Sequence, residues 1–127
     1  MESRLLAKRL GYAVRYVAHN IIGDYNATYN VEYKGQHLIT KAAKRLGIPL
    51  NEIWISEMWR PYERYILFHE LREIHYRGKG LDPKSAHEKA IEDTPETWKD
   101  NAEFRRMITE IKEMDEKTAR EKEKPEK

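Results

Sequence analysis

The residues best suited to chemistry in this chain are a histidine and two glutamates that lie close together, with a second histidine further on. His69, Glu70 and Glu73 form the pattern His-Glu-x-x-Glu, and His87 follows within the triplet Ala-His-Glu. His69 and Glu73 are four residues apart, so on a helix their side chains lie one turn apart on the same face, within reach of a single ion. Glu70 lies about 100° further around that helix.

His87 can join this pair only if the chain folds back between them. Glu73 lies five residues before Gly78, and His87 lies five residues after Asp82. In an antiparallel pair of helices, positions at equal distances from the turn face each other. Because the chain is 36% charged, the five-residue motif alone is a weak pattern and the interpretation depends on His87. The alternative is that Glu73 pairs with a neighbouring arginine and His87 makes only a hydrogen bond.

Two imidazoles and one carboxylate suit a zinc ion of the catalytic kind. Three protein ligands leave the fourth position of a four-coordinate zinc to water, and zinc makes that water acidic enough to attack near neutral pH. Glu70 is next to a ligand and is the natural general base for the water's proton. The same donor set also suits iron, manganese or nickel, so the sequence leaves the metal open. The chain has no cysteine, which excludes thiolate ligands and disulfides.

The motif resembles a minimal zincin. It is similar to the small archaeal metallopeptidase scaffolds called minigluzincins, and to short archaeal and phage proteins with HExxE followed by an Ala-His pair. The resemblance covers roughly residues 53–91. Gluzincins have HExxH and a later glutamate, whereas this chain has the same donors with imidazole and carboxylate exchanged.

This resemblance implies a zinc-dependent hydrolase that acts on peptide or protein substrates. It implies that His69, Glu73 and His87 hold the metal and that Glu70 is the catalytic base. It also implies a sheet edge that aligns the substrate by strand addition, and residues 53–55 (Ile-Trp-Ile) are placed to supply it. A catalytically inactive interaction protein on the same scaffold remains an alternative.

The helices that must position these residues have clear start and stop signals. Pro61 suits the first turn of a helix, which is predicted to run to Arg77 and to end at the glycines of residues 78–80. Asp82 followed by proline predicts the start of the next helix, which runs to about Asp93. The motif-bearing helix is therefore central and is followed by an αα-hairpin.

The remaining elements complete an α+β fold with a two- or three-stranded sheet and four to five helices. Helical spacing of apolar residues predicts a helix over 3–19, and strands are predicted over 29–33, where apolar and polar residues alternate, and over 53–56. Gly47 and Pro49 end a short predicted helix over 37–46, and Thr94 followed by Pro95 starts a predicted helix over 96–114. Residues 1–114 form one predicted domain. Residues 115–127 have no apolar face and form a charged C-terminal tail.

A different class of protein competes for residues 38–60, which resemble a helix-turn-helix that binds DNA. Ala-Ala-x-x-Leu-Gly-Ile precedes a second helix over residues 50–58, and three basic residues form a local patch: Lys41, Lys44 and Arg45. Against this, Glu52 and Glu57 lie in the recognition helix, and only Arg60 is suited to donate strongly to guanine.

Composition limits the partners and the location. The 24 basic and 22 acidic residues give a net charge of +2, so no domain-wide field draws the chain to nucleic acid or to a membrane. No segment approaches the roughly 20 apolar residues of a membrane span, and we expect a soluble, cytoplasmic protein. The high charge, with no cysteine and one glutamine, is similar to that of proteins from hot environments.

Aromatic residues are numerous for so short a chain. Five of them are predicted to build the core rather than to bind a ligand: Trp54, Trp59, Tyr62, Tyr65 and Trp98. The surplus would also suit a dimer interface, and the sequence leaves the oligomeric state open. It leaves the substrate open as well.

Overall fold

A computed structural model of the chain describes residues 2–23 and 25–123. The chain forms two compact units, Met1–Thr94 and Pro95–Lys127. The first unit contains all four strands found in the described residues and five α-helices, and the second contains two helices. The α+β class is confirmed, with a larger sheet and more helices than predicted.

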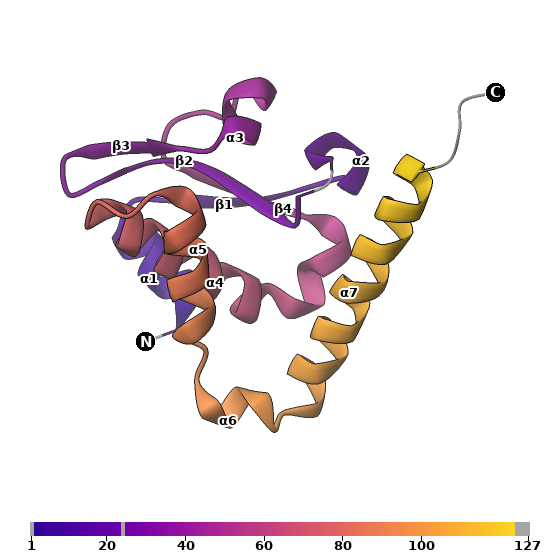
Figure 1. The fold of residues 1–127 in the computed structure, drawn as a ribbon. Coiled ribbons are helices and arrows are strands. Elements are labelled where there is room, and N and C mark those ends of the chain that lie inside the picture. The colour runs from indigo at the N-terminus through magenta and orange to yellow at the C-terminus, as the bar shows by residue number, and fades with distance from the viewer. Residues whose placement is uncertain (1, 24, 124–127) are drawn as a thin grey trace. The chain divides into compact units, whose positions relative to one another are not determined.

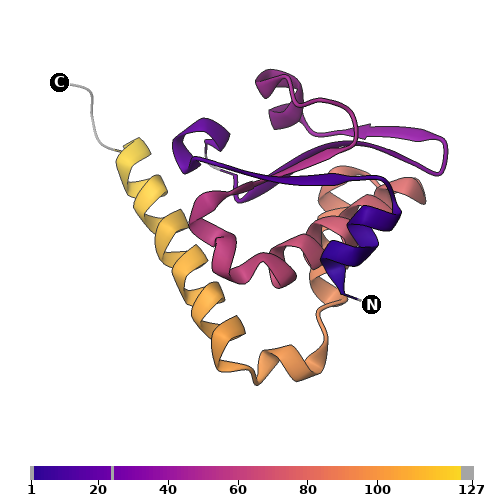
Figure 2. The same ribbon diagram turned by 180° about the vertical axis from the view of Figure 1, so that it is seen from behind.

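The first unit begins with helices and strands interspersed and ends with three consecutive helices. Its helices are α1 (Ser3–Arg9), α2 (His19–Ile22), α3 (Lys41–Leu46), α4 (Glu63–Gly78) and α5 (Pro83–Glu92), and a 3₁₀ helix, η1 (Glu57–Tyr62), leads into α4. Its strands are β1 (Ala13–Val17), β2 (Ala27–Tyr33), β3 (Gln36–Ile39) and β4 (Glu52–Ser56). The helices α1, α4 and α5 lie on one side of the sheet, and α2 and α3 lie on the other (Figures 1 and 2).

The sheet is mixed, with the strand order β1-β4-β2-β3. β4 pairs in parallel with β1, with Val14 opposite Ile53, and antiparallel with β2, with Tyr29 opposite Ile53. β2 and β3 form an antiparallel hairpin. β4 therefore has a neighbour on both sides, and the expectation that residues 53–55 form a substrate-aligning edge is wrong, because their backbone groups already pair within the sheet.

The predicted helix over residues 3–19 is also wrong, because it ends early and is followed by a strand. α1 ends at Arg9, and Gly11 takes a left-handed φ of 86° that turns the chain into β1. The spacing of Leu10, Val14 and Val17 is helical, but the pairing of Val14 with Ile53 in β4 overrides it. The β-branched and aromatic residues of β1 favour this outcome.

The predicted helix over residues 37–46 begins later than expected. Lys34 and Gly35 both have positive φ, at 49° and 80°, as a two-residue hairpin turn with the twist of the strands requires. Residues 36–39 consequently return as β3. Thr40 then caps α3 by accepting a hydrogen bond from the backbone N–H of Ala43 at 2.9 Å.

The proposed recognition helix over residues 50–58 is a strand followed by the start of η1. A strand in the interior of a sheet cannot enter the major groove as a helix-turn-helix requires. The DNA-binding alternative for residues 38–60 therefore loses its second helix.

The apolar core of the first unit lies around the sheet and α4. Trp59, Tyr62 and Tyr65 are buried as predicted, whereas Trp54 is only half-buried, and so is Trp98, which belongs to the second unit. The apolar side chains of α4 that are buried include Ile66, Leu67, Leu71 and Ile74. None of the helices in the described part of the chain combines the length and the apolar composition that a membrane span requires.

The second unit contains α6 (Glu96–Lys99) and α7 (Ala102–Glu123). The single predicted helix over residues 96–114 is therefore interrupted. Asn101 begins α7 by accepting a hydrogen bond from the backbone N–H of Phe104 at 3.1 Å. α7 continues through the predicted boundary between residues 114 and 115, so the described part of the predicted tail is helical, and residues 124–127 lie outside the described residues.

Candidate metal centre

The hairpin of α4 and α5 forms as predicted, and its turn has the chemistry that such a turn needs. Gly80 has a φ of 100°, which only glycine adopts readily. Asp82 caps α5 by accepting a hydrogen bond from the backbone N–H of Ser85 at 3.1 Å, and Pro83 occupies the first turn. The chain thus returns along α4, and α5 packs against it.

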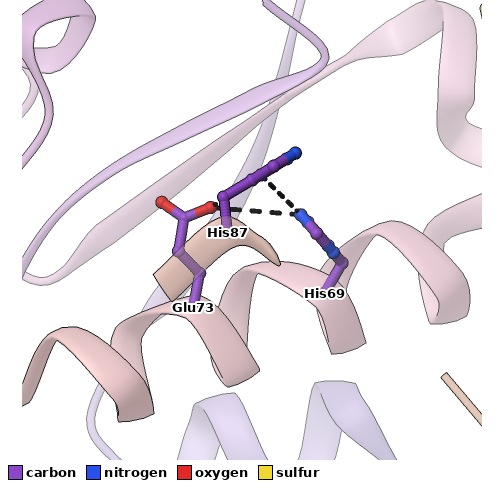
Figure 3. A group of neighbouring side chains, drawn as sticks. All are labelled: His69, Glu73 and His87. Atoms are coloured by element: carbon purple, nitrogen blue, oxygen red, sulfur yellow. Dashed lines mark hydrogen bonds and ion pairs between the residues drawn. The ribbon is translucent and has the colours of Figure 1, made fainter. Parts of the chain in front are cut away.

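The hairpin brings together His69 and Glu73 from α4 and His87 from α5, which we call the histidine cluster (Figure 3). His69 Nε2 lies 3.0 Å from His87 Nδ1, and Glu73 Oε2 lies 3.4 Å from His87 Nδ1 and 4.0 Å from His69 Nε2. One ligand atom from each residue lies within 4.8 Å of the other two. All three predicted ligands therefore converge.

These distances are close to those that a tetrahedral zinc imposes. Nitrogen and oxygen ligands about 2.0–2.1 Å from the ion would be roughly 3.3–3.4 Å apart. The pair of Glu73 and His87 already has this spacing at 3.4 Å. The two imidazoles must separate by a few tenths of an ångström from their 3.0 Å contact, and His69 must approach Glu73 from 4.0 Å. No distance has to change by more than about 0.6–0.7 Å, so the spacing of the donor set fits the ion.

The cluster lies at the edge of the core, and its protonation follows from that position. The exposed fractions of the side chains are 26% for His69, 13% for Glu73 and 54% for His87. Burial, and then the charge of His87, lowers the pKa of His69 to about 4. The hydrogen bond between His87 and Glu73 raises the pKa of His87, although burial opposes the change. His69 is therefore neutral near pH 7, as a metal ligand must be.

Glu73 keeps its negative charge although it is largely enclosed. Burial by itself would raise the pKa of Glu73, but hydrogen bonds from His87 and Tyr29 and the charges of both imidazoles lower it. A carboxylate that is ionised and faces two nitrogen ligands is ready to bind a cation.

Glu70 lies next to the cluster and is the most enclosed acid of the group. It is 8% exposed. Burial, and then the charge of Glu73, raises the pKa of Glu70 well above its usual value. A cation held by Glu73 would oppose the second of these causes and favour the ionised carboxylate that a general base needs.

Two residues that the sequence did not single out as ligands or bases complete the surroundings of Glu73. The Tyr29 hydroxyl donates a hydrogen bond to Glu73 Oε1 at 2.8 Å, and Arg77 Nη1 donates one to the Tyr29 oxygen at 3.0 Å. Tyr29 is fully buried, and burial, followed by the charges of Glu73 and Glu70, raises the pKa of its hydroxyl. Tyr29 is 44 residues from Glu73 in sequence, so only its place in an alternating strand pointed to the core.

The C-terminal end of α4 lies very close to β2. A Cβ atom at Gly78 would be 2.5 Å from Cδ2 of the Tyr33 ring. The Tyr33 hydroxyl contacts His75 Nδ1 at 3.1 Å, and the Gln36 side chain donates to the Gly78 carbonyl at 2.6 Å. These contacts hold α4 against the strand that carries Tyr29.

The N-terminal end of α4 carries a second polar group, the Glu63 cluster of Arg4, Tyr16 and Glu63. Arg4 forms a two-pronged ion pair with Glu63, in which Nε donates to Oε2 at 2.9 Å and Nη2 donates to Oε1. The Tyr16 hydroxyl donates to Glu63 Oε1 at 2.6 Å. The pKa of Glu63 is lowered, first by the hydrogen bond from Arg4, against the effect of burial, and then by that from Tyr16.

Comparison of the chain with protein-family models, with curated proteins and with solved structures found no match. The zincin resemblance therefore rests on the residues of this chain and on their geometry.

Proposed function

We propose that this protein is a zinc-dependent hydrolase of the minimal metallopeptidase type. In this proposal the histidine cluster holds zinc and Glu70 is the general base. The observation that carries the proposal is the convergence of three ligand atoms, from two helices, to within 4.8 Å of one another. The spacing of these atoms needs little change to accept a tetrahedral ion.

The residues divide the work of such a reaction among them. When bound, zinc supplies a Lewis acid and an acidified water. Glu70 would accept a proton from the attacking water and would donate it to the amine that leaves, and its raised pKa suits a carboxyl that both accepts and donates a proton. His87 is 54% exposed, which leaves the cluster accessible from solvent on the side of α5.

A peptide substrate that adds to the sheet would have to use an edge strand. The edges are β1 and β3, because β4 and β2 each pair on both sides. Arg77 connects the site to β3, since it contacts both the Tyr29 hydroxyl and, at 3.5 Å, the carbonyl of Ile39. We therefore assign substrate alignment to β3 rather than to residues 53–55.

The metal is tested by zinc analysis and titration of the purified protein and three variants. The wild type should bind one zinc ion per chain. His69→Ala and His87→Ala should each weaken binding by more than about 100-fold, because loss of a direct ligand exceeds the effect of an outer-shell partner. His37→Ala, which removes an exposed histidine of β3 outside the cluster, is the control and should bind like the wild type. A wild type without zinc, or both cluster variants with unchanged affinity, would refute the proposal.

The catalytic part is tested with Glu70→Gln on a fluorogenic peptide library. The wild type with zinc should cleave at least one peptide, and the variant should retain zinc and lose turnover. Loss of zinc would instead identify Glu70 as a ligand. Zinc binding without turnover of any peptide by the wild type would leave a metal-binding protein that is not a peptidase.

A further inference from the structure

The two carboxylate oxygens of Glu73 have different surroundings. Oε1 accepts the hydrogen bond of the Tyr29 hydroxyl at 2.8 Å. Oε2 faces the histidines, at 3.4 Å from His87 Nδ1 and 4.0 Å from His69 Nε2. One oxygen is thus directed to the sheet and the other to the point where the ligand atoms converge.

The direction of the Tyr29 hydroxyl is itself fixed by a second residue. Arg77 Nη1 donates to the Tyr29 oxygen at 3.0 Å, and Nη2 lies 3.5 Å from the carbonyl of Ile39. A guanidinium has only donors, so Arg77 occupies a lone pair of the phenol oxygen. The hydroxyl proton of Tyr29 is left for Glu73 Oε1.

We infer that Tyr29, oriented by Arg77, is a positioning residue that makes Glu73 a ligand through one oxygen only. The inference rests on the proposed function, because it concerns the coordination of the proposed metal. With Oε1 engaged by Tyr29, the protein supplies two nitrogens and one oxygen, and a fourth position is left for water. Outer-shell partners of this kind orient ligands and tune the metal.

The same arrangement determines which ions the site prefers. A carboxylate released from Tyr29 can bind an ion through both oxygens, which raises the coordination number and suits calcium, an ion that takes six to eight oxygen ligands. A carboxylate held to one oxygen, beside two imidazoles, favours zinc and similar ions instead. Tyr29 and Arg77 are thus specificity-determining residues for the metal.

A purely structural role for the Tyr29 hydrogen bond, as a link between β2 and α4, leads to a different prediction. The Tyr29 hydroxyl is buried and needs a partner in any case. If this were its whole role, its loss would lower stability and leave the geometry of a bound ion unchanged. The electronic spectrum of a bound ion separates the two roles, because it reports coordination number.

The experiment is titration of the metal-free protein with Co²⁺, followed by visible absorption. The wild type should show the intense bands of four-coordinate cobalt. Tyr29→Phe should show weaker bands of higher coordination, a roughly 10- to 100-fold loss of affinity and a gain in binding of Ca²⁺ relative to Zn²⁺. Arg77→Met should change the spectrum in the same direction, and Arg77→Lys, which keeps a donor, should restore it.

Tyr16→Phe is the matched control, because Tyr16 also donates to a carboxylate of α4, at 2.6 Å from Glu63 Oε1. It should leave the cobalt spectrum unchanged. A wild-type spectrum in folded Tyr29→Phe would overturn the inference and leave the metal centre standing. If Tyr29→Phe does not fold, a wild-type spectrum in Arg77→Met overturns the inference equally. A wild type that binds no cobalt overturns the metal centre and the inference together.

Discussion

The two polar clusters of α4 are linked to the sheet in the same way, but different groups surround the glutamate in each. In each, a glutamate of the helix accepts the hydroxyl of a strand tyrosine, Tyr16 for Glu63 and Tyr29 for Glu73. In the Glu63 cluster, the cation is Arg4, which binds the carboxylate directly. In the histidine cluster, the arginine binds the tyrosine instead, and the second carboxylate oxygen of Glu73 faces two imidazoles.

The two clusters therefore differ in the neighbours of the carboxylate and not in the carboxylate itself. Arg4 keeps its charge at every pH at which Glu63 is ionised, so this carboxylate has a permanent cationic partner. Imidazoles can be neutral and can bind a metal through nitrogen.

The largest expected effect is stabilisation by zinc. A ligand that binds only the folded state at a thousand times its Kd adds about 4 kcal/mol to the free energy of unfolding. We expect a stabilisation of this size for the wild type in urea unfolding with excess zinc. Glu63→Gln should show the same gain, and His87→Ala should lose more than half of it at the same zinc concentration, because its affinity is at least about 100-fold lower. Equal gains in all three proteins would contradict the contrast between the clusters.

The next effect concerns the end of α4 beside the histidine cluster. Gly78→Ala should lower the free energy of unfolding by about 1–3 kcal/mol, because its Cβ would overlap the Tyr33 ring. Zinc affinity should fall with it, and the Glu63 cluster should be unaffected. Lys79→Ala, at the exposed neighbouring position, is the control and should change stability by less than about 0.5 kcal/mol. Urea unfolding of both variants measures these changes, and equal stabilities of Gly78→Ala and Lys79→Ala would contradict the prediction.

The smallest expected effect is the contribution of Glu63 to the pH dependence of the free energy of unfolding. The folded state lowers the pKa of this carboxyl, so its contribution is present above the unfolded pKa and is lost as the pH falls through the lower folded pKa. Arg4 is 52% exposed, so we expect less than about 1 kcal/mol from this pair. Unfolding followed between about pH 6 and pH 3 should be flatter for Glu63→Gln than for the wild type. An identical slope would contradict the prediction.

The histidine cluster could be predicted because its signals are local. Pro61, the glycines of residues 78–80 and Asp82 mark the ends of the two helices within a short stretch of chain. Once both helices are assigned, counting from the turn places His87 opposite Glu73, and their atoms are 3.4 Å apart in the structure.

The sheet and the outer shell of the site could not be predicted in this way, because they depend on contacts between distant segments. β1 has the apolar spacing of a helix and becomes a strand by pairing with β4, with Ala13 opposite Glu52. Tyr29 reaches Glu73 because β2 packs against α4, although the two residues are 44 positions apart in sequence. Single-residue patterns hold no information on such pairings, since strand preference depends on the neighbours that a strand acquires.

The close contact between Gly78 and the Tyr33 ring affects the separation of α4 and β2 beside the histidine cluster. Tyr33 and Tyr29 are four residues apart in β2, and alternate side chains of a strand share a face. The Tyr33 ring therefore limits how closely α4 can approach that face of the sheet. Because residue 78 has no methyl group, α4 comes close enough for Glu73 to accept the hydrogen bond of the Tyr29 hydroxyl. The absence of a side chain at Gly78 thus helps to set the distance between Glu73 and Tyr29.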